Sequence, residues 1–401
     1  MIKKLKEVCD FYTGTGFPIK YQGKTEGIFP FYKVGDIANN VMSGNIYLSH
    51  CNNYISLDDI KEIKGTIIPE GVVVFAKIGE ALKLNRRVIT TRKCLIDNNA
   101  MGIGAKPEYL DSKFFYYYMK KLKMETYAES TTVPSVRKSR LEELLIDIPS
   151  FEKQKLIVNI LSKIHNIINN RRIQLLKFEE LIKARFVEMF GDPIDNFQKW
   201  PVKKLKDISS LITNGNTPKG GSSNYVNEGI IFIRSQNVWR NRIDLSDVVY
   251  IDESTHNGMS KSSVHHNDIL ITKTGRINTE NSSLGRAALY QGDDNTANIN
   301  GHVYLVRLKD CVNPQFVVTI LTSEAYRKYI RKVCVGGIDK RQINLDQVEN
   351  FPIIQPPLAD QIMFASLLKQ IDKSKVVVPS KIKNAIFAIM LSVSFGQITS
   401  I

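Results

Sequence analysis

The chain repeats its own pattern after about 200 residues. Leu5-Lys6-Glu7-Val8 returns as Leu205-Lys206-Asp207-Ile208, and a hydrophobic stretch ending in Lys77-Ile-Gly79 returns as one ending in Lys273-Thr-Gly275. Solenoid repeats have periods of about 20 to 50 residues, so this long period indicates a duplicated domain. One molecule would then present two similar but non-identical working surfaces.

Length and charge limit the class of protein. The 401 residues leave room for two or three domains that each bury a core. Lysine and arginine number 55 against 40 aspartates and glutamates, a formal charge of +15. This excess favours a polyanionic partner such as nucleic acid, because phosphate neutralisation provides most sequence-independent affinity. The alternative is a basic surface that only maintains solubility.

Cysteine use and hydropathy bear on location. Five cysteines are scattered without a Cys-x-x-Cys pair, which is typical of a reducing compartment without disulfides or a zinc site. The N-terminal residues lack the apolar stretch of a secretory signal, and the longest apolar run, 385–393, is too short to span a bilayer. We therefore expect a cytoplasmic protein with no membrane contact, no metal and no cofactor.

The chain divides by its residue patterns into strand-rich and helical segments. Short strands separated by turns fill the two repeated segments, and helical periodicity fills the two segments that follow them. Each strand-rich segment should also contain one helix near its end, over Ser112–Met124 and Pro314–Arg331. The expected segments are 1–150, 151–191, 192–357 and 358–401. The fold class is mixed α/β (α+β), with two similar units separated by two long antiparallel coiled-coil helices in a pseudo-twofold internal repeat.

The two helical segments carry apolar residues at spacings of three and four, the periodicity of a coiled coil. The predicted seam residues are Ile157, Leu161, Ile164, Ile168, Leu175, Phe178 and Ile182, and then Phe364, Leu368 and Ile371. A narrow seam favours a partner helix, whereas a helix lying on a globular core usually shows a wider stripe. Pro379 predicts a kink or an early end of the second helix.

In their order, these motifs resemble the specificity subunit of a type I restriction–modification enzyme. The resemblance rests on the repeated opening motif, on Lys77 and Lys273 before their glycines, and on the segment Thr132–Val136. It rests also on a proline followed by a glutamine at the start of each helical segment, and on Phe190-Gly191-Asp192 at the first helix end. The segment from Pro379 onward departs from the charged helix that is usual in the family. The proline–glutamine pairs are Pro149 with Gln154 and Pro356 with Gln361.

The resemblance implies a non-catalytic protein that selects DNA. Each unit would be a target recognition domain that reads one half of a split, double-stranded DNA target. The paired helices would set the gap and dock two adenine-N6 methyltransferase subunits, and a restriction/translocase subunit would join for cleavage. A stand-alone DNA-cleaving enzyme would require a carboxylate cluster with metal-ligand spacing, which the sequence lacks. A coiled-coil protein adaptor, whose basic charge would be incidental, would show no salt-dependent binding to duplex DNA.

Arginine, lysine, asparagine and glutamine are the side chains that read base edges, and cations also hold phosphates. The candidates in the first unit are Lys33, Lys77, Lys83, Arg86 and Arg87. The candidates in the second unit are Arg234, Gln236, Asn237, Arg240, Lys273, Arg276, Asn278 and Arg286. The alternative is that they are solvated charges on a basic surface. Because the two sets differ, we expect the units to read different half-sites.

Overall fold

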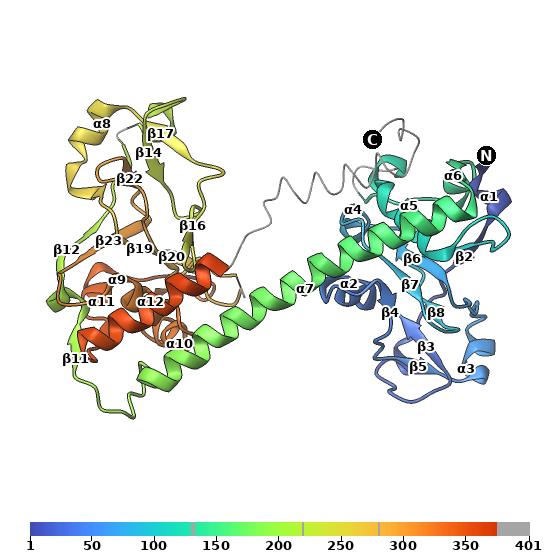
Figure 1. Cartoon of the computed structure of the whole chain (residues 1–401), viewed down its shortest axis with the longest axis horizontal. Coiled ribbons are helices and arrows are strands. Elements are labelled where there is room, and N and C mark those ends of the chain that lie inside the picture. Colours follow the sequence, from blue (N-terminus) through green and yellow to red (C-terminus); the bar gives the residue numbers. More distant parts are fainter. Residues whose placement is uncertain (130–132, 219, 280, 375–401) are drawn as a thin grey trace. The chain divides into compact units, whose positions relative to one another are not determined.

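The computed structural model describes residues 1–129, 133–218, 220–279 and 281–374 (Figure 1). They form two compact units, unit 1 within residues 1–174 and unit 2 within residues 175–374. The division falls inside α7 (Phe151–Phe190), a helix of 40 residues. Among the described residues, no helix combines the length and the apolar character that crossing a membrane requires.

Unit 1 is organised around a five-stranded sheet of order β2-β9-β6-β7-β4. Its central strand β6 is Val-Val-Val-Phe-Ala and is buried throughout, since alternate side chains face cores on opposite sides of the sheet. Helices α5 (Ser112–Lys121) and α2 (Val34–Met42) cover these two sides. The strands are β2 (Cys9–Thr13), β9 (Ala100–Ala105), β6 (Val72–Ala76), β7 (Arg87–Thr90) and β4 (Tyr47–Leu48).

A smaller sheet and a terminal strand pair complete unit 1. The smaller sheet has the order β5 (Tyr54–Ile55), β3 (Phe29–Tyr32) and β8 (Leu95–Ile96). Strand β1 (Ile2–Lys4) pairs antiparallel with β10 (Leu145–Asp147), so the beginning and the end of the unit are joined. The short helices are α1 (Leu5–Val8), α3 (Leu57–Glu62), α4 (Glu80–Lys83) and α6 (Lys138–Glu142).

Unit 2 repeats this plan with additions. Its main sheet has the order β12-β23-β19-β21, its second sheet the order β13-β17-β14-β22-β18, and β11 pairs with β26 as β1 pairs with β10. The strands of these sheets are β11 (Val202–Lys204), β12 (Ser209–Asn214), β13 (Tyr225–Val226), β14 (Ile230–Ile233), β17 (Val249–Ile251), β18 (Ser263–Val264), β19 (Ile269–Thr272), β21 (Ala287–Leu289), β22 (Ala297–Ile299), β23 (Val303–Leu308) and β26 (Pro352–Ile354).

The additions are a two-stranded hairpin and a small three-stranded sheet. The hairpin pairs β15 (Val238–Trp239) with β16 (Arg242–Ile243). The three-stranded sheet has the order β20 (Thr274–Arg276), β25 (Lys340–Gln342) and β24 (Val335–Gly336). The helices of unit 2, besides the end of α7, are α8 (Glu253–Gly258), α9 (Pro314–Thr322), α10 (Glu324–Val333), α11 (Leu345–Glu349) and α12 (Leu358–Ser374).

A buried glutamine marks the same joint in both units. Gln154 and Gln361 are 0% and 1% exposed, near the starts of α7 and α12. The Gln154 Oε1 accepts a hydrogen bond from the Asp111 N–H (2.8 Å), and the Gln361 Oε1 accepts one from the Asn313 N–H (3.0 Å). Asp111 and Asn313 are the N-caps of α5 and α9. The proline–glutamine motif thus ties each connecting helix to its unit, and the predicted duplication is confirmed.

The predicted helix seam is buried or half-buried at every described position, while the residues between its members are mostly exposed. Within unit 2, α12 runs antiparallel to the end of α7 (Figure 1). The Phe364 ring lies 5.4 Å from that of Phe186 and 5.7 Å from that of Phe190, between centroids. The seam prediction missed these two phenylalanines, which the core of unit 2 buries. Pro379 and the rest of 375–401 lie outside the described residues.

The helix predicted over Pro314–Arg331 is two helices, which corrects that prediction. Ser323 takes an extended conformation (ψ 156°) between α9 and α10, and its Oγ accepts a hydrogen bond from the Tyr326 N–H (3.2 Å). A serine hydroxyl competes in this way with helical backbone bonding and starts a new helix. The other predicted helix, over Ser112–Met124, ends earlier because Leu122 is extended.

Candidate nucleic-acid interface

In unit 1, Lys77 and Arg86 are the candidates whose charges are available. Lys77 directly follows β6, and its carbonyl oxygen accepts a hydrogen bond from the Val136 N–H (2.9 Å). Both side chains are half-buried, and neither forms a hydrogen bond or ion pair with the residues that the structure describes. Lys33 donates to Gln22 (2.6 Å), and exposed Lys83 pairs with Glu80 on α4 (2.7 Å).

Arg87 belongs to the core, so the expectation that it contacts DNA is wrong. It is 1% exposed, and its guanidinium donates to the carbonyl oxygens of Asn85 (2.7 Å) and Leu122 (2.8 Å). Burial lowers its pKa to about 10. Strand β7 starts at this residue, and all four of its side chains are buried. Arg86, the neighbouring residue, remains available for an anion.

In unit 2, Asn237 shapes the loop that carries Arg234 and Gln236. The Asn237 side chain is buried, accepts a hydrogen bond from the Arg234 N–H and donates to the carbonyl oxygens of Asp244 and Asp247. Its predicted contact with DNA is therefore incorrect in this structure. Arg234 donates a hydrogen bond to the Asp247 carbonyl oxygen (2.9 Å), and Gln236 donates one to the Asp247 carboxylate (2.7 Å).

The buried side chain of Arg286 supports the loop that follows β20, through hydrogen bonds to its backbone. It is 9% exposed, donates to the carbonyl oxygen of Ser282 (3.0 Å) and lies with its guanidinium carbon 4.1 Å from the centre of the Trp239 ring. Arg242 lies over the same ring at 5.3 Å. Stacking of this kind holds an aromatic ring and a cation together. Arg286 is thus a positioning residue, which corrects the expectation of direct DNA contact.

Four arginines of unit 2 form what we call the arginine band, namely Arg240, Arg327, Arg331 and Arg341. Burial lowers the pKa of Arg240, and the nearby charges of Arg327 and Arg331 lower it further, while that of Glu324, which pairs with Arg327 at 3.7 Å, raises it. Arg331 and Arg341 together act on the Cys334 thiol, whose pKa burial raises and their charges lower. Close cations repel one another, so an arriving phosphate would stabilise this arrangement.

Sequence reasoning missed Arg327 and Arg331, which lie on α10. Buried Tyr326 and Ile330 form the inner side of this helix, and each is followed by two cations. Exposed Lys328 belongs to the first of these pairs. The signal was present in the sequence as basic pairs at a spacing of four, Arg327-Lys328 and Arg331-Lys332.

The remaining candidates of unit 2 lie at and beside β20. Arg276 is 71% exposed in its side chain, and its Nε lies 3.3 Å from the Asp339 carboxylate on the neighbouring strand connection. Exposed Asn278 makes no side-chain hydrogen bond with the described residues. Lys273 is the counterpart of Lys77, because its carbonyl oxygen accepts a hydrogen bond from the Ile343 N–H (3.0 Å).

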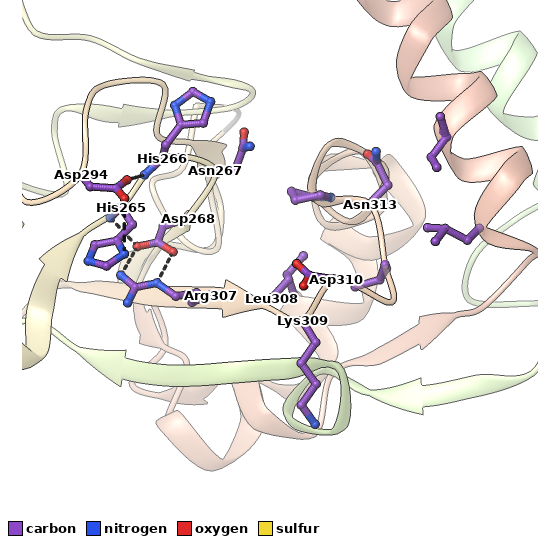
Figure 2. Close-up of a pocket in the computed structure, with 14 residues that line it drawn as sticks. His265, His266, Asn267, Asp268, Asp294, Arg307, Leu308, Lys309, Asp310 and Asn313 are labelled. Carbon is purple, nitrogen blue, oxygen red and sulfur yellow. Dashed lines mark hydrogen bonds and ion pairs between the residues drawn. The ribbon is translucent and has the colours of Figure 1, made fainter.

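A cavity of about 490 Å³ lies beside the turn before β19 and the start of α12 (Figure 2). Figure 2 shows Asp268 and Arg307 facing each other there, joined by two bonds of 2.9 Å and 2.7 Å. Arg307 and Lys309 are its two cations, against three carboxylates, those of Asp268, Asp294 and Asp310. No group of three metal-ligating side chains occurs in the described parts of the chain. The balance of charge makes this cavity unsuitable for a polyanion.

The model of the family described as the type I restriction modification DNA specificity domain matches residues 1–177 and 198–387. The chain belongs to this family. The two matches follow the two copies of the internal repeat, so each unit is a specificity domain. The chain is accordingly a DNA sequence-specificity subunit of a type I restriction–modification system, and it is the non-catalytic subunit of that system. Neither a stand-alone nuclease nor a protein adaptor is favoured.

Two relatives and a solved structure agree with this family over 80–100% of the chain. The specificity subunit of type I restriction enzyme MjaIX of Methanocaldococcus jannaschii is 23% identical over 426 residues, covering 99% of this chain and 93% of the relative. The EcoBI specificity subunit of Escherichia coli is 20% identical over 352 residues, covering 80% of this chain and 72% of the relative. The crystal structure of the type I S subunit from M. genitalium shares the fold at 15% identity, with a TM-score of 0.56 and coverage of 100% and 96%.

Proposed function

We propose that the two units read the two halves of a split DNA target, with 1–150 and 192–357 as the recognition domains. Segments 151–191 and 358–401 would form the paired helices that set the gap. The observation that supports this most is the duplicated fold with different cations at its loops. The proposed contact residues are Lys33, Lys77, Lys83 and Arg86 in unit 1, and Arg234, Gln236, Arg240, Lys273, Arg276 and Asn278 with the arginine band in unit 2.

Replacing Arg327 and Arg331 together with glutamine should weaken duplex binding and reduce its salt dependence. Each lost phosphate contact makes the slope of log affinity against log salt shallower by about 0.9, or about 1.8 for the pair. Titration of the assembled complex with duplex DNA at several salt concentrations measures this slope. The matched control, Lys261→Gln with Lys309→Gln, removes the same charge from exposed positions elsewhere in unit 2. Equal slopes for both double variants would contradict a phosphate contact at the band.

We further propose that two methyltransferase subunits dock at the starts of α7 and α12, and that a restriction/translocase subunit joins them. Both helices expose apolar side chains at the same two positions, 207 residues apart in the sequence. Phe151 and Leu156 are 42% and 54% exposed, and Leu358 and Met363 are 39% and 53% exposed. A repeated apolar pair suits two copies of one partner. Five free cysteines support a cytoplasmic location for this assembly.

Replacing both Phe151 and Leu156 with serine should prevent the binding of one of the two methyltransferase subunits and leave the other bound. Burying two large apolar side chains contributes about 3 kcal/mol or more, so that site should weaken by about 100-fold. Mass photometry of the reconstituted complex would show the stoichiometry change from two copies to one. The control replaces Ile19 and Ile28, which are 86% and 66% exposed in unit 1, and should retain both copies. Two retained copies in the Phe151 and Leu156 variant would exclude this docking site.

A further inference from the structure

Three exposed side chains that differ in chemistry lie together, two at the tip of the β24–β25 hairpin and one on the neighbouring strand β20. Ile338 is 91% exposed, the Asp339 side chain is 57% exposed, and Arg276 on β20 is 71% exposed. We propose that this tip enters the major groove and that Asp339 and Ile338 are specificity-determining residues of unit 2. The inference rests on the function proposed above.

The tip is held by a fixed framework. Strand β25 is the central strand of its sheet, pairing with β20 through Arg276 opposite Lys340 and with β24 on its other side. The Ile277 N–H donates to the carbonyl oxygen of Asp339 (3.0 Å). At the base of the hairpin Ile343 is fully buried, and its carbonyl oxygen accepts from the Tyr304 hydroxyl (2.8 Å). A β-ribbon fits the major groove, and a rigid support gives it defined register.

Glycine at position 275 is required for this framework. A Cβ on Gly275 would lie 2.2 Å from the Leu284 backbone nitrogen, so any side chain would push the two segments apart. Strand β20 therefore lies directly against the backbone of the following loop. This close approach holds Arg276, the next residue, in place beside the hairpin.

The chemistry of the tip fits base edges better than phosphates. A carboxylate such as Asp339 is repelled by phosphates, but it accepts a hydrogen bond from an exocyclic amine such as the cytosine N4. Arg276 can donate to guanine O6 and N7, and Ile338 offers an apolar contact for the thymine methyl. An exposed isoleucine alone needs no explanation. The inference therefore depends on its position beside the paired arginine and carboxylate.

Cations around the tip would bind the phosphates of the DNA backbone while the tip contacts the bases. Lys340 is exposed on β25, and Arg341 of the arginine band is the next residue. The Arg341 Nε is buried and has no hydrogen-bond partner among the described residues. At the equivalent place unit 1 has, in its described part, an isolated bridge between Ile78 and Ser135. The Glu129 N–H also donates to the Ser135 carbonyl oxygen there (3.1 Å), so the described residues of unit 1 share this pairing, while residues 130–132 lie outside the described residues.

Replacing Asp339 with alanine tests this role in the complex with the methyltransferase subunit. Affinity for the cognate duplex should fall by about 10- to 100-fold, because one base-edge contact is lost. Affinity for an unrelated duplex should stay the same or rise, since a charge that repels phosphates is removed. The methylated sequence should lose its preference at one position of one half-site, and Ile338→Ala should relax a neighbouring position.

Asp310→Ala is the matched control, because it removes the same charge from an exposed position in the cavity of Figure 2. It should leave the affinities and the methylated sequence unchanged. An unchanged motif in Asp339→Ala, or an equal loss of cognate and unrelated binding, would overturn the inference while the split target of the wild type remained. Absence of any split target in the wild-type complex would instead overturn the proposed function. Unchanged melting temperatures would verify that the variants are folded.

Discussion

Replacing Arg307 with alanine is expected to destabilise unit 2 by about 3–5 kcal/mol, because it leaves a buried carboxylate without its cation. The Asp268 side chain is 1% exposed, and Arg307 provides two of its hydrogen bonds. The His265 N–H would remain as a donor, at 2.7 Å. At about 2–4 °C per kcal/mol for a unit of this size, its melting temperature should fall by roughly 6–20 °C in calorimetry.

Unit 1 provides the matched control for this prediction. In the equivalent strand pair it has Val72 opposite Gly104, with no charge on either residue. Removing both members of a buried ion pair costs far less than removing one, so Asp268→Val combined with Arg307→Ala should recover most of the loss. A single Arg307 variant that melts within about 2 °C of the wild type would show that Asp268 does not depend on Arg307.

Replacing Phe364 with alanine is expected to cost about 3–5 kcal/mol, because it removes one of four clustered aromatic rings and leaves a cavity beside the other three. Phe364 is fully buried and contacts Phe186 and Phe190 from α7, and Phe190 contacts Phe316 from α9 at 4.9 Å between centroids. This cluster joins α12 to the end of α7. Its loss should therefore lower the melting temperature of unit 2 and also loosen the antiparallel contact between the two helices.

Met363 is the control for this change, since it is the adjacent residue on α12 and is 53% exposed. Met363→Ala should alter stability by no more than about 0.5 kcal/mol. Phe364→Leu should fall between the two, because it retains part of the buried volume. A Phe364→Ala protein as stable as Met363→Ala would mean that the aromatic cluster does not hold α12 in place. Urea denaturation of the full chain measures all three variants.

The architecture could be predicted because it depends on patterns that repeat in the sequence. The duplication was visible in Lys77 and Lys273, and the glutamines that the sequence placed after each proline are the buried joints of the structure. The helix seam followed from periodicity alone, because a spacing of three and four residues places side chains on one face. Phe186 was not predicted as a seam residue, because the spacing of the seam falls on Arg185, the residue before it.

The candidate site was harder to predict, because composition identifies cations but not their long-range partners. Buried Arg87 donates a hydrogen bond to the carbonyl oxygen of Leu122, which lies 35 residues further along the chain. Buried Arg286 stacks on the Trp239 ring, and these two residues, far apart in the sequence, meet only in the folded unit. Asp339, which we propose as a specificity-determining residue, was not among the sequence candidates, because only cations and amides were considered as readers of base edges. Its pairing with Arg276 is a property of the fold alone.

The most direct test of the split-target function is to exchange one unit and map the methylated sequence. The chain is co-expressed with a type I methyltransferase subunit from the same genome, and N6-methyladenine is located by long-read sequencing. The wild type should methylate two short half-sites around a fixed gap. A chimera with residues 192–357 taken from a relative of different specificity should change one half-site and keep the other. A continuous target in the wild type, or a change of both half-sites in the chimera, would contradict the account.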